Sequence, residues 1–71
     1  MKYKWYEIPI RVKRNGKVLI VPANEVISGD KVWLCDVEYT SDGCIADDEE
    51  EIMYIKTNKI DAWPAAMFLS K

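Results

Sequence analysis

Apolar side chains recur at every second position on both sides of Asn15-Gly16, in residues 8–12 and 19–23. A type I′ turn needs positive φ at both central residues, and Asn-Gly is the dipeptide that adopts it at the least cost. The pattern therefore predicts a β-hairpin. Its core face pairs Val12 with Leu19, Ile10 with Val21 and Ile8 with Ala23. Its other face pairs Lys13 with Val18 and Arg11 with Ile20, so aliphatic groups lie beside long basic stems on a half-solvated surface.

A second alternating stretch, Lys31 to Thr40, predicts the third strand. One face carries Trp33, Cys35, Val37 and Tyr39, and the other carries Val32, Leu34, Asp36 and Glu38. Ser41-Asp42-Gly43 predicts the next turn, but continuing that hairpin would set acidic residues opposite each other: Glu38 against Asp47 and Asp36 against Glu49. We therefore expect the acidic run to leave the sheet as a loop or an exposed edge, with pairing resumed by Ile52 to Thr57.

The segments between and beyond these strands carry turn and helix signals. Trp5 and Tyr6 interrupt the first alternation, which predicts a β-bulge near Tyr6 or Glu7 that turns these side chains inward. Pro22 ends the second strand, and the next residues predict an arc or helical turn, 23–27, that closes at Ser28-Gly29. Pro64 suits the first position of a short helical turn ending at Leu69. We expect three side chains to plug one end of the sheet: Trp63, Met67 and Phe68.

These elements predict one mainly β domain spanning residues 1–71. Four to five short strands joined by tight turns, with a short C-terminal helical turn, favour a small, highly curved antiparallel sheet or an SH3-like barrel. The stretch Ile27-Ser28-Gly29-Asp30-Lys31-Val32 resembles the G-D-x-V opening of many small barrels, including the KOW and Tudor types. The resemblance covers a handful of residues and implies no functional ones.

Charge is sorted along the chain although the net charge is only −2. Residues 1–19 contain six Lys and Arg against one Glu, whereas residues 21–51 contain ten acids against one Lys. Acidity peaks in Asp47-Asp48-Glu49-Glu50-Glu51. Carboxylates cannot be buried unpaired, so this run must face water, a cation or a basic partner.

Several function classes fit the composition poorly. Without histidine, the commonest general base and metal ligand are missing, and no Ser has a base close in sequence, so we expect no catalytic residues. The acidic run does not match an EF-hand loop, so we expect no metal site and no cofactor. No segment has the length of a membrane span or the apolar core of a signal peptide, which predicts a cytoplasmic protein without membrane contact. Cys35 and Cys44 are expected to be reduced, because the predicted hairpin at Asp42-Gly43 sets them opposite Glu50 and Ser41.

The leading hypothesis is a non-catalytic protein-interaction module, a small inhibitor that occludes a basic site on a partner protein. In its sharpest version that site binds nucleic acid and the acidic surface imitates phosphates. Its acidic surface comprises Asp36, Glu38, Asp42, Asp47, Asp48, Glu49, Glu50 and Glu51. Short acidic single-domain proteins of this kind resemble the inhibitors that phages encode against host nucleases and immune effectors. The resemblance is one of class and involves no motif.

Two alternatives use the basic half of the chain. In the first, a small barrel binds nucleic acid, with cations on phosphates and rings on bases, through Tyr3, Lys4, Trp5, Tyr6, Arg11 and Lys13. The pI of about 5.0 disfavours it. In the second, the basic hairpin of one copy meets the acidic loop of another in a homo-oligomer, around an apolar centre of Val18, Ile20 and Trp5.

Overall fold

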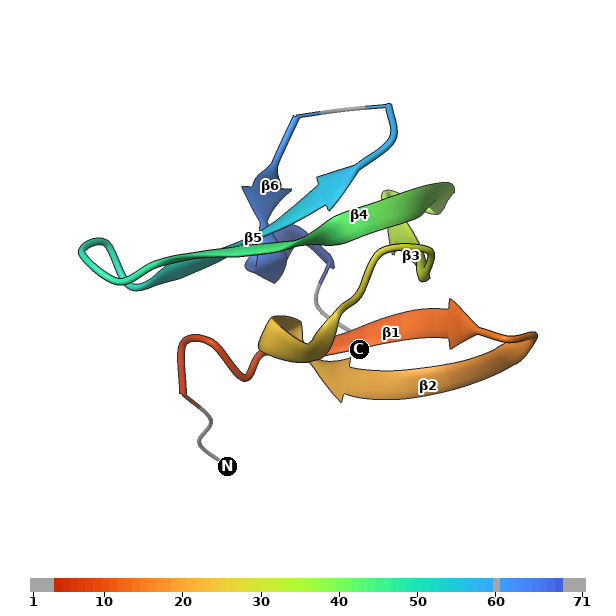
Figure 1. Ribbon diagram of the computed structural model, residues 1–71, viewed down its shortest axis with the longest axis horizontal. Helices are drawn as coiled ribbons and strands as arrows, with labels where there is room; N and C mark the ends of the chain where they lie inside the picture. Colours follow the sequence, from red (N-terminus) through yellow and green to blue (C-terminus); the bar gives the residue numbers. More distant parts are fainter. Residues whose placement is uncertain (1–3, 60, 69–71) are drawn as a thin grey trace.

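The chain forms a curled, open antiparallel sheet of six strands with no α-helix in the described part, which confirms the mainly β prediction. This computed structural model describes residues 4–59 and 61–68. The strands are β1 (Pro9–Arg14), β2 (Lys17–Pro22), β3 (Lys31–Leu34), β4 (Val37–Asp47), β5 (Ile52–Thr57) and β6 (Trp63–Pro64). Two 3₁₀ turns are η1 (Ala23–Glu25) and η2 (Ala65–Phe68). The strand order is β2-β1-β3-β4-β5-β6, and the sheet does not close into a barrel (Figure 1).

The β1–β2 hairpin has the predicted turn and register. Asn15 and Gly16 have φ of 54° and 79°, as a type I′ turn requires. Val12 faces Leu19, and Lys13 faces Val18. The local turn signal therefore fixes which hairpin residues enter the core.

The next hairpin turns earlier than predicted. Cys35 and Asp36 have φ of 53° and 64°, and they form a two-residue turn that pairs β3 directly with β4. The predicted turn at Asp42-Gly43 and the predicted single strand 31–40 are both wrong. The turn also changes which side chains share a sheet face. Tyr39 lies opposite Val32, and Glu38 lies opposite Trp33, whereas the prediction placed Tyr39 with Trp33 and Glu38 with Val32.

Asp42 and Gly43 form a β-bulge within β4 instead. Pairing shifts between Ser41, which faces Thr57, and Cys44, which faces Ile55. Gly43 has φ of 103°, and its N–H donates to Ser41 Oγ at 3.0 Å. The extra residue bends β4. This long strand therefore continues from the β1–β3 part of the sheet into the β5–β6 part (Figure 1).

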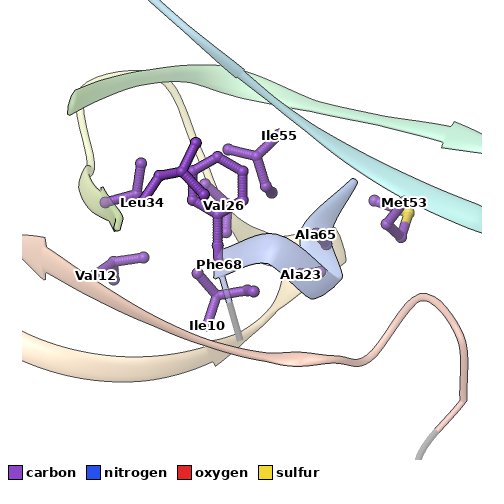
Figure 2. Packing of buried hydrophobic residues seen from close by; sticks show 10 residues of the cluster. Ile10, Val12, Ala23, Val26, Leu34, Met53, Ile55, Ala65 and Phe68 are labelled. Carbon is purple, nitrogen blue, oxygen red and sulfur yellow. The ribbon is translucent and has the colours of Figure 1, made fainter. Parts of the chain in front are cut away.

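The core lies inside the curl and is built from β1, β3, β5, the two 3₁₀ turns and the loop that follows η1. The buried apolar residues are Ile10, Val12, Ala23, Val26, Val32, Leu34, Met53, Ile55, Ala65 and Phe68. Figure 2 shows Phe68 of η2 among side chains of the strands, and η2 contacts β1, β3 and β5. Each fully buried side chain of Val, Leu, Ile, Met or Phe stabilises the fold by roughly 1.5–3 kcal/mol. A core of this size therefore tolerates the truncation of few side chains.

The two ends differ in detail from the prediction. At the N-terminal end Glu7 N–H donates to the Lys4 carbonyl at 2.8 Å, so a turn stands where a bulge was predicted. At the C-terminal end Trp63 and Pro64 pair with β5 as β6, and the helical turn begins only at Ala65. Of the three predicted plug residues Phe68 is buried, whereas Trp63 and Met67 are exposed. Leu69 lies outside the described residues.

An ion pair between Arg14 and the buried carboxylate of Asp30 fastens the loop before β3 to the end of β1. Arg14 Nε and Nη2 donate to the two carboxylate oxygens of Asp30 at 2.8 and 2.7 Å. The Ile27 N–H adds a third hydrogen bond to that carboxylate at 3.2 Å. Asp30 is 1% exposed, and the hydrogen bonds from Arg14 hold its pKa below the usual range despite burial. The loop that resembles a small-barrel opening thus serves here to position β3.

Candidate interaction surfaces

The acidic run forms the tip of the β4–β5 hairpin. Of the two predicted placements, a loop or an exposed edge, the structure has the loop. Asp47 faces Ile52 as the last strand pair, and residues 48–51 make the connecting turn. Asp47 Oδ1 accepts hydrogen bonds from the N–H groups of Glu49 and Glu50, both at 3.1 Å. The tip projects beyond the rest of the molecule at the left of Figure 1. An aspartate side chain thus fixes the backbone that carries the other four carboxylates.

The acidic tip, residues 47–51, carries its charge without compensation from the described chain. Asp48 to Glu51 are exposed, and the ion pair that the structure describes is Arg14–Asp30, far from the tip. Glu51 has φ of 57°, a left-handed conformation that costs a non-glycine residue roughly 1–2 kcal/mol. The tip therefore combines like-charge crowding with local backbone strain.

The other predicted acidic residues lie elsewhere. Asp36 is in the β3–β4 turn and Glu38 is near the start of β4, whereas Asp47 is its last residue. At about 3.3 Å per residue, Glu38 and Asp47 are separated by roughly 30 Å of chain along β4. Asp42 lies at the bulge, where it accepts a hydrogen bond from Ser28 Oγ at 3.4 Å. The eight predicted carboxylates thus occupy three places, with five of them at the tip.

The predicted basic and aromatic face is also divided. Trp5 and Tyr6 are half-buried against the core, with their rings edge to face at a centroid distance of 5.2 Å. Lys4 is exposed beside them, and Tyr3 lies outside the described residues. Arg11 and Lys13 are on the outer sheet face. Trp5 therefore contributes to packing, and it does not join Val18 and Ile20 in one apolar centre.

The structure instead gathers cations and one ring on the outer face of β1 and β3. The Arg11 guanidinium lies over Trp33, 4.6 Å from the ring centroid. Lys13 faces Lys31, whose Nζ donates to Thr40 Oγ1 at 2.8 Å. Sequence reasoning missed Lys31 and Trp33, because the signal that joins them to Arg11 and Lys13 is the non-local β1–β3 pairing.

A shallow hollow of about 310 Å³ lies beside this cationic face. Its lining residues are Lys13, Asn15, Gly16, Gly29, Lys31 and Glu38. The two ammonium groups make it attractive to anions, while the Glu38 carboxylate offsets part of their charge. The chemistry that these groups support is binding through hydrogen bonds and charge.

β2 is an edge of the sheet and displays apolar side chains on both faces. Val18, Leu19 and Ile20 are 61%, 37% and 56% exposed, and β1 is the one neighbour that β2 has among the described strands. Such an edge is unusual in a soluble β protein, where charged residues or bulges commonly interrupt it. The sequence indicates this exposure only through the half-solvated face of the predicted hairpin.

Both cysteines are free thiols, and neither occupies the predicted pairing position. Cys35 is exposed in the β3–β4 turn, and Cys44 is half-buried opposite Ile55 rather than Ser41. Burial raises the pKa of the Cys44 thiol, which lowers its thiolate fraction at neutral pH. Within the described residues no three His, Cys, Asp or Glu side chains are grouped so as to hold a metal ion.

Comparison with known proteins yields no matching family model, no matching curated protein and no matching solved structure. In the described part of the chain, no helix has the length and apolar character needed to cross a membrane. The candidate surfaces therefore rest on their own geometry: the acidic tip, the cationic face and the β2 edge.

Proposed function

We propose that this chain is a non-catalytic protein-interaction module that inserts its acidic tip into a basic site on a partner protein and so occludes it. The observation that carries the proposal is the exposed run of four acidic residues on a turn fixed by Asp47. A two-stranded arm can enter a groove that the broader body of the sheet cannot. A groove that binds nucleic acid suits the acidic tip, because the cations of such a groove are spaced to meet successive negative charges.

Electrostatics supports fast and salt-sensitive association. The tip concentrates negative charge at the end of the molecule, where its field is least offset by the lysines and arginines of β1 and β3. Such charge raises association rates and is screened over about 8 Å at physiological ionic strength. Binding should therefore weaken as salt rises.

Local strain at Glu51 supports a binding role as well. Glycine would adopt its positive φ without a Cβ penalty, yet a fifth acidic residue stands there. Strained residues that persist on an exposed turn are more common at binding sites than elsewhere. The charge at position 51 is thus present at a cost to folding.

The test compares two charge-matched variants of the full chain. The tip variant carries Asp48→Asn, Glu49→Gln and Glu50→Gln and keeps Asp47, so the turn retains its hydrogen bonds. The control carries the same number of neutralisations away from the tip: Asp36→Asn, Glu38→Gln and Asp42→Asn. Proteins captured from lysate at low salt are identified, and the binder is then purified for titration with each variant. We expect the tip variant to weaken binding at least tenfold and the control to leave it nearly unchanged.

Two results would contradict occlusion by the tip. One is equal loss of affinity in both variants, which would indicate a general charge effect. The other is a purified binder whose own ligand, nucleic acid for example, does not compete with this chain. In that case the chain would bind without covering the site.

The cationic face supports a second candidate, direct binding of single-stranded nucleic acid. Arg11, Lys13 and Lys31 lie on one sheet face around Trp33, an arrangement that can bind phosphates and stack a base. Lys13→Gln with Lys31→Gln should then weaken binding of a labelled oligonucleotide and lower the salt slope of log K by about 0.7 per lost phosphate contact. The tip variant should bind this oligonucleotide as well as the parent or better, which is the opposite of its effect on an occluded protein.

A further inference from the structure

The edge strand β2 has backbone groups that no described residue satisfies. Arg14 and Lys17 flank a two-residue turn, so they form a hydrogen-bonded pair with β1, and such pairs alternate along an antiparallel ladder. Lys17, Leu19 and Val21 therefore direct their N–H and C=O groups toward β1. Val18 and Ile20 direct theirs outward, away from the sheet. Val18 and Ile20 are also the two most exposed aliphatic side chains of β2.

This edge lacks the devices that commonly protect edges. The other end of the sheet is β6, which is two residues long and contains Pro64. In β2 the charged residue Lys17 and the N–H-deficient Pro22 stand only at the ends, with four consecutive aliphatic residues between them. A long, uncharged edge of this kind is suited to receive another strand.

We infer that β2 pairs antiparallel with β2 of a second copy, about a two-fold axis at Leu19. In this register Val18 of each copy faces Ile20 of the other, and each such pair exchanges both outward N–H···O=C hydrogen bonds. Leu19 meets Leu19 on the inner face, and Lys17 faces Val21, so no like charges are opposed. Pro22 falls opposite Gly16, where the strand has already ended in the turn, so its missing N–H removes no bond.

A second copy fits this edge better than an unrelated strand for two reasons. The edge is self-complementary, because its outward groups are spaced so that Val18 and Ile20 satisfy each other across a two-fold axis, as isologous contacts require. The chain also has a small core, and association is a common remedy for marginal size. The paired sheet gains a central apolar strip of Val18 and Ile20 from both copies, flanked by Arg11 and Lys13.

The dimer leaves the acidic tip free. The tip lies at the end of the β4–β5 arm, and β1 and β3 stand between this arm and the β2 edge in the strand order (Figure 1). Dimerisation through β2 is therefore independent of the function proposed for the tip. A dimer would present two tips, and the contact between copies would involve no carboxylate.

The test measures the dimer dissociation constant by sedimentation equilibrium. One variant, Val18→Lys with Ile20→Lys, places lysine opposite lysine on both sides of the axis. A second, Val18→Glu with Ile20→Lys, places glutamate opposite lysine only if Val18 faces Ile20 of the other copy. The control, Val37→Lys with Ile45→Lys, adds the same charge at two similarly exposed aliphatic residues of β4. Circular dichroism and urea unfolding establish that each variant is folded.

We expect the parent to dimerise, the double-lysine variant to weaken the dimer by about 100-fold or more, and the glutamate–lysine variant to recover most of that loss. The β4 control should dimerise like the parent. A parent that stays monomeric up to about 1 mM overturns the inference. So does a dimer that the double-lysine variant leaves intact, or one that the glutamate–lysine variant fails to restore. A parent that grows into open-ended oligomers also overturns it, because two-fold pairing is closed.

Discussion

The Arg14–Asp30 ion pair offers the sharpest test of how this small sheet is held together. Asp30 accepts hydrogen bonds from two guanidinium nitrogens and from the Ile27 N–H, and it is 1% exposed. Asp30→Asn keeps the shape of the side chain but removes the charge and at least one acceptor. The loop between η1 and β3 is then fastened to β1 by weaker bonds.

The expected loss of stability in Asp30→Asn is set by the fact that Asp30 is buried whereas Arg14 is partly exposed. Breaking a buried pair by removing one partner costs about 3–5 kcal/mol, and the lower end applies because Arg14 is 29% exposed and can turn toward water. A domain of this size is stable by roughly 4–10 kcal/mol. Asp30→Asn should therefore lower the free energy of unfolding by about 3 kcal/mol. Arg14→Met with Asp30→Asn should cost less than the two single changes added together.

The pH dependence has a definite sign. The pKa of Asp30 is lowered in the folded state, mainly by the hydrogen bonds from Arg14. Its contribution to stability is therefore fully present above the unfolded pKa of about 3.9 and is lost as pH falls through the lower folded value. The unfolded and folded pKa values of Asp30 place this loss roughly between pH 5 and pH 2. Over that range the free energy of unfolding should fall more for the parent than for Asp30→Asn.

Urea unfolding followed by tryptophan fluorescence at several pH values measures both effects. A cost below about 1 kcal/mol for Asp30→Asn, the value of an ordinary hydrogen bond, would refute the reasoning. Equal pH slopes for the parent and the variant would also refute it, because they would show that Asp30 does not titrate differently in the two states. In either case the short contacts would contribute little to folding.

Three further predictions concern stability, and each is measured by urea or thermal unfolding. Glu51→Gly should stabilise the fold by about 1 kcal/mol, by relieving the positive φ and one like charge, and would be contradicted by a loss of stability. Cys35→Asn with Asp36→Gly gives the β3–β4 turn the residues that type I′ favours and should stabilise it by about 1–2 kcal/mol; no gain would mean that the two native residues are not strained there. Phe68→Ala should cost about 3–4 kcal/mol and Met67→Ala less than about 0.5 kcal/mol, because the first side chain is buried and the second is half exposed; equal costs would place η2 differently.

The fold was predictable where the local signal agrees with the structure. Asn15-Gly16 has the residues that a type I′ turn favours, and its hairpin has the predicted register. The β3–β4 turn was missed because Cys35 and Asp36 adopt the same positive φ without a turn-forming glycine. Asp42-Gly43 carries the stronger sequence signal, but the chain uses the freedom of Gly43 to bend β4 at a bulge.

The candidate sites were predictable to different degrees. The acidic tip was expected as a loop because facing carboxylates would destabilise a ladder, and residues 48–51 do form the turn. The cationic face could not be assembled from sequence, since Lys31 and Trp33 lie beside Arg11 and Lys13 only because β3 pairs with β1, with β2 and η1 between them in the chain. The exposure of β2 likewise depends on strand order, which local patterns do not fix.

The conformational or burial preference of the residues conflicts with the fold at three places in this chain. The three places differ in whether they belong to a proposed binding surface. Glu51 and the β2 edge lie on exposed surfaces that β1 and β3 separate in the strand order. Glu51 weakens the isolated molecule through backbone strain, and the edge does so through unpaired backbone groups and exposed apolar side chains. A partner at the tip and a second copy at the edge would offset those costs on binding. Cys35 and Asp36 have the same kind of strain but belong to neither surface. If relieving the strain at Glu51 impairs partner binding while relieving it at Cys35 and Asp36 does not, the cost at the tip reflects function and not a general tolerance of poor turns.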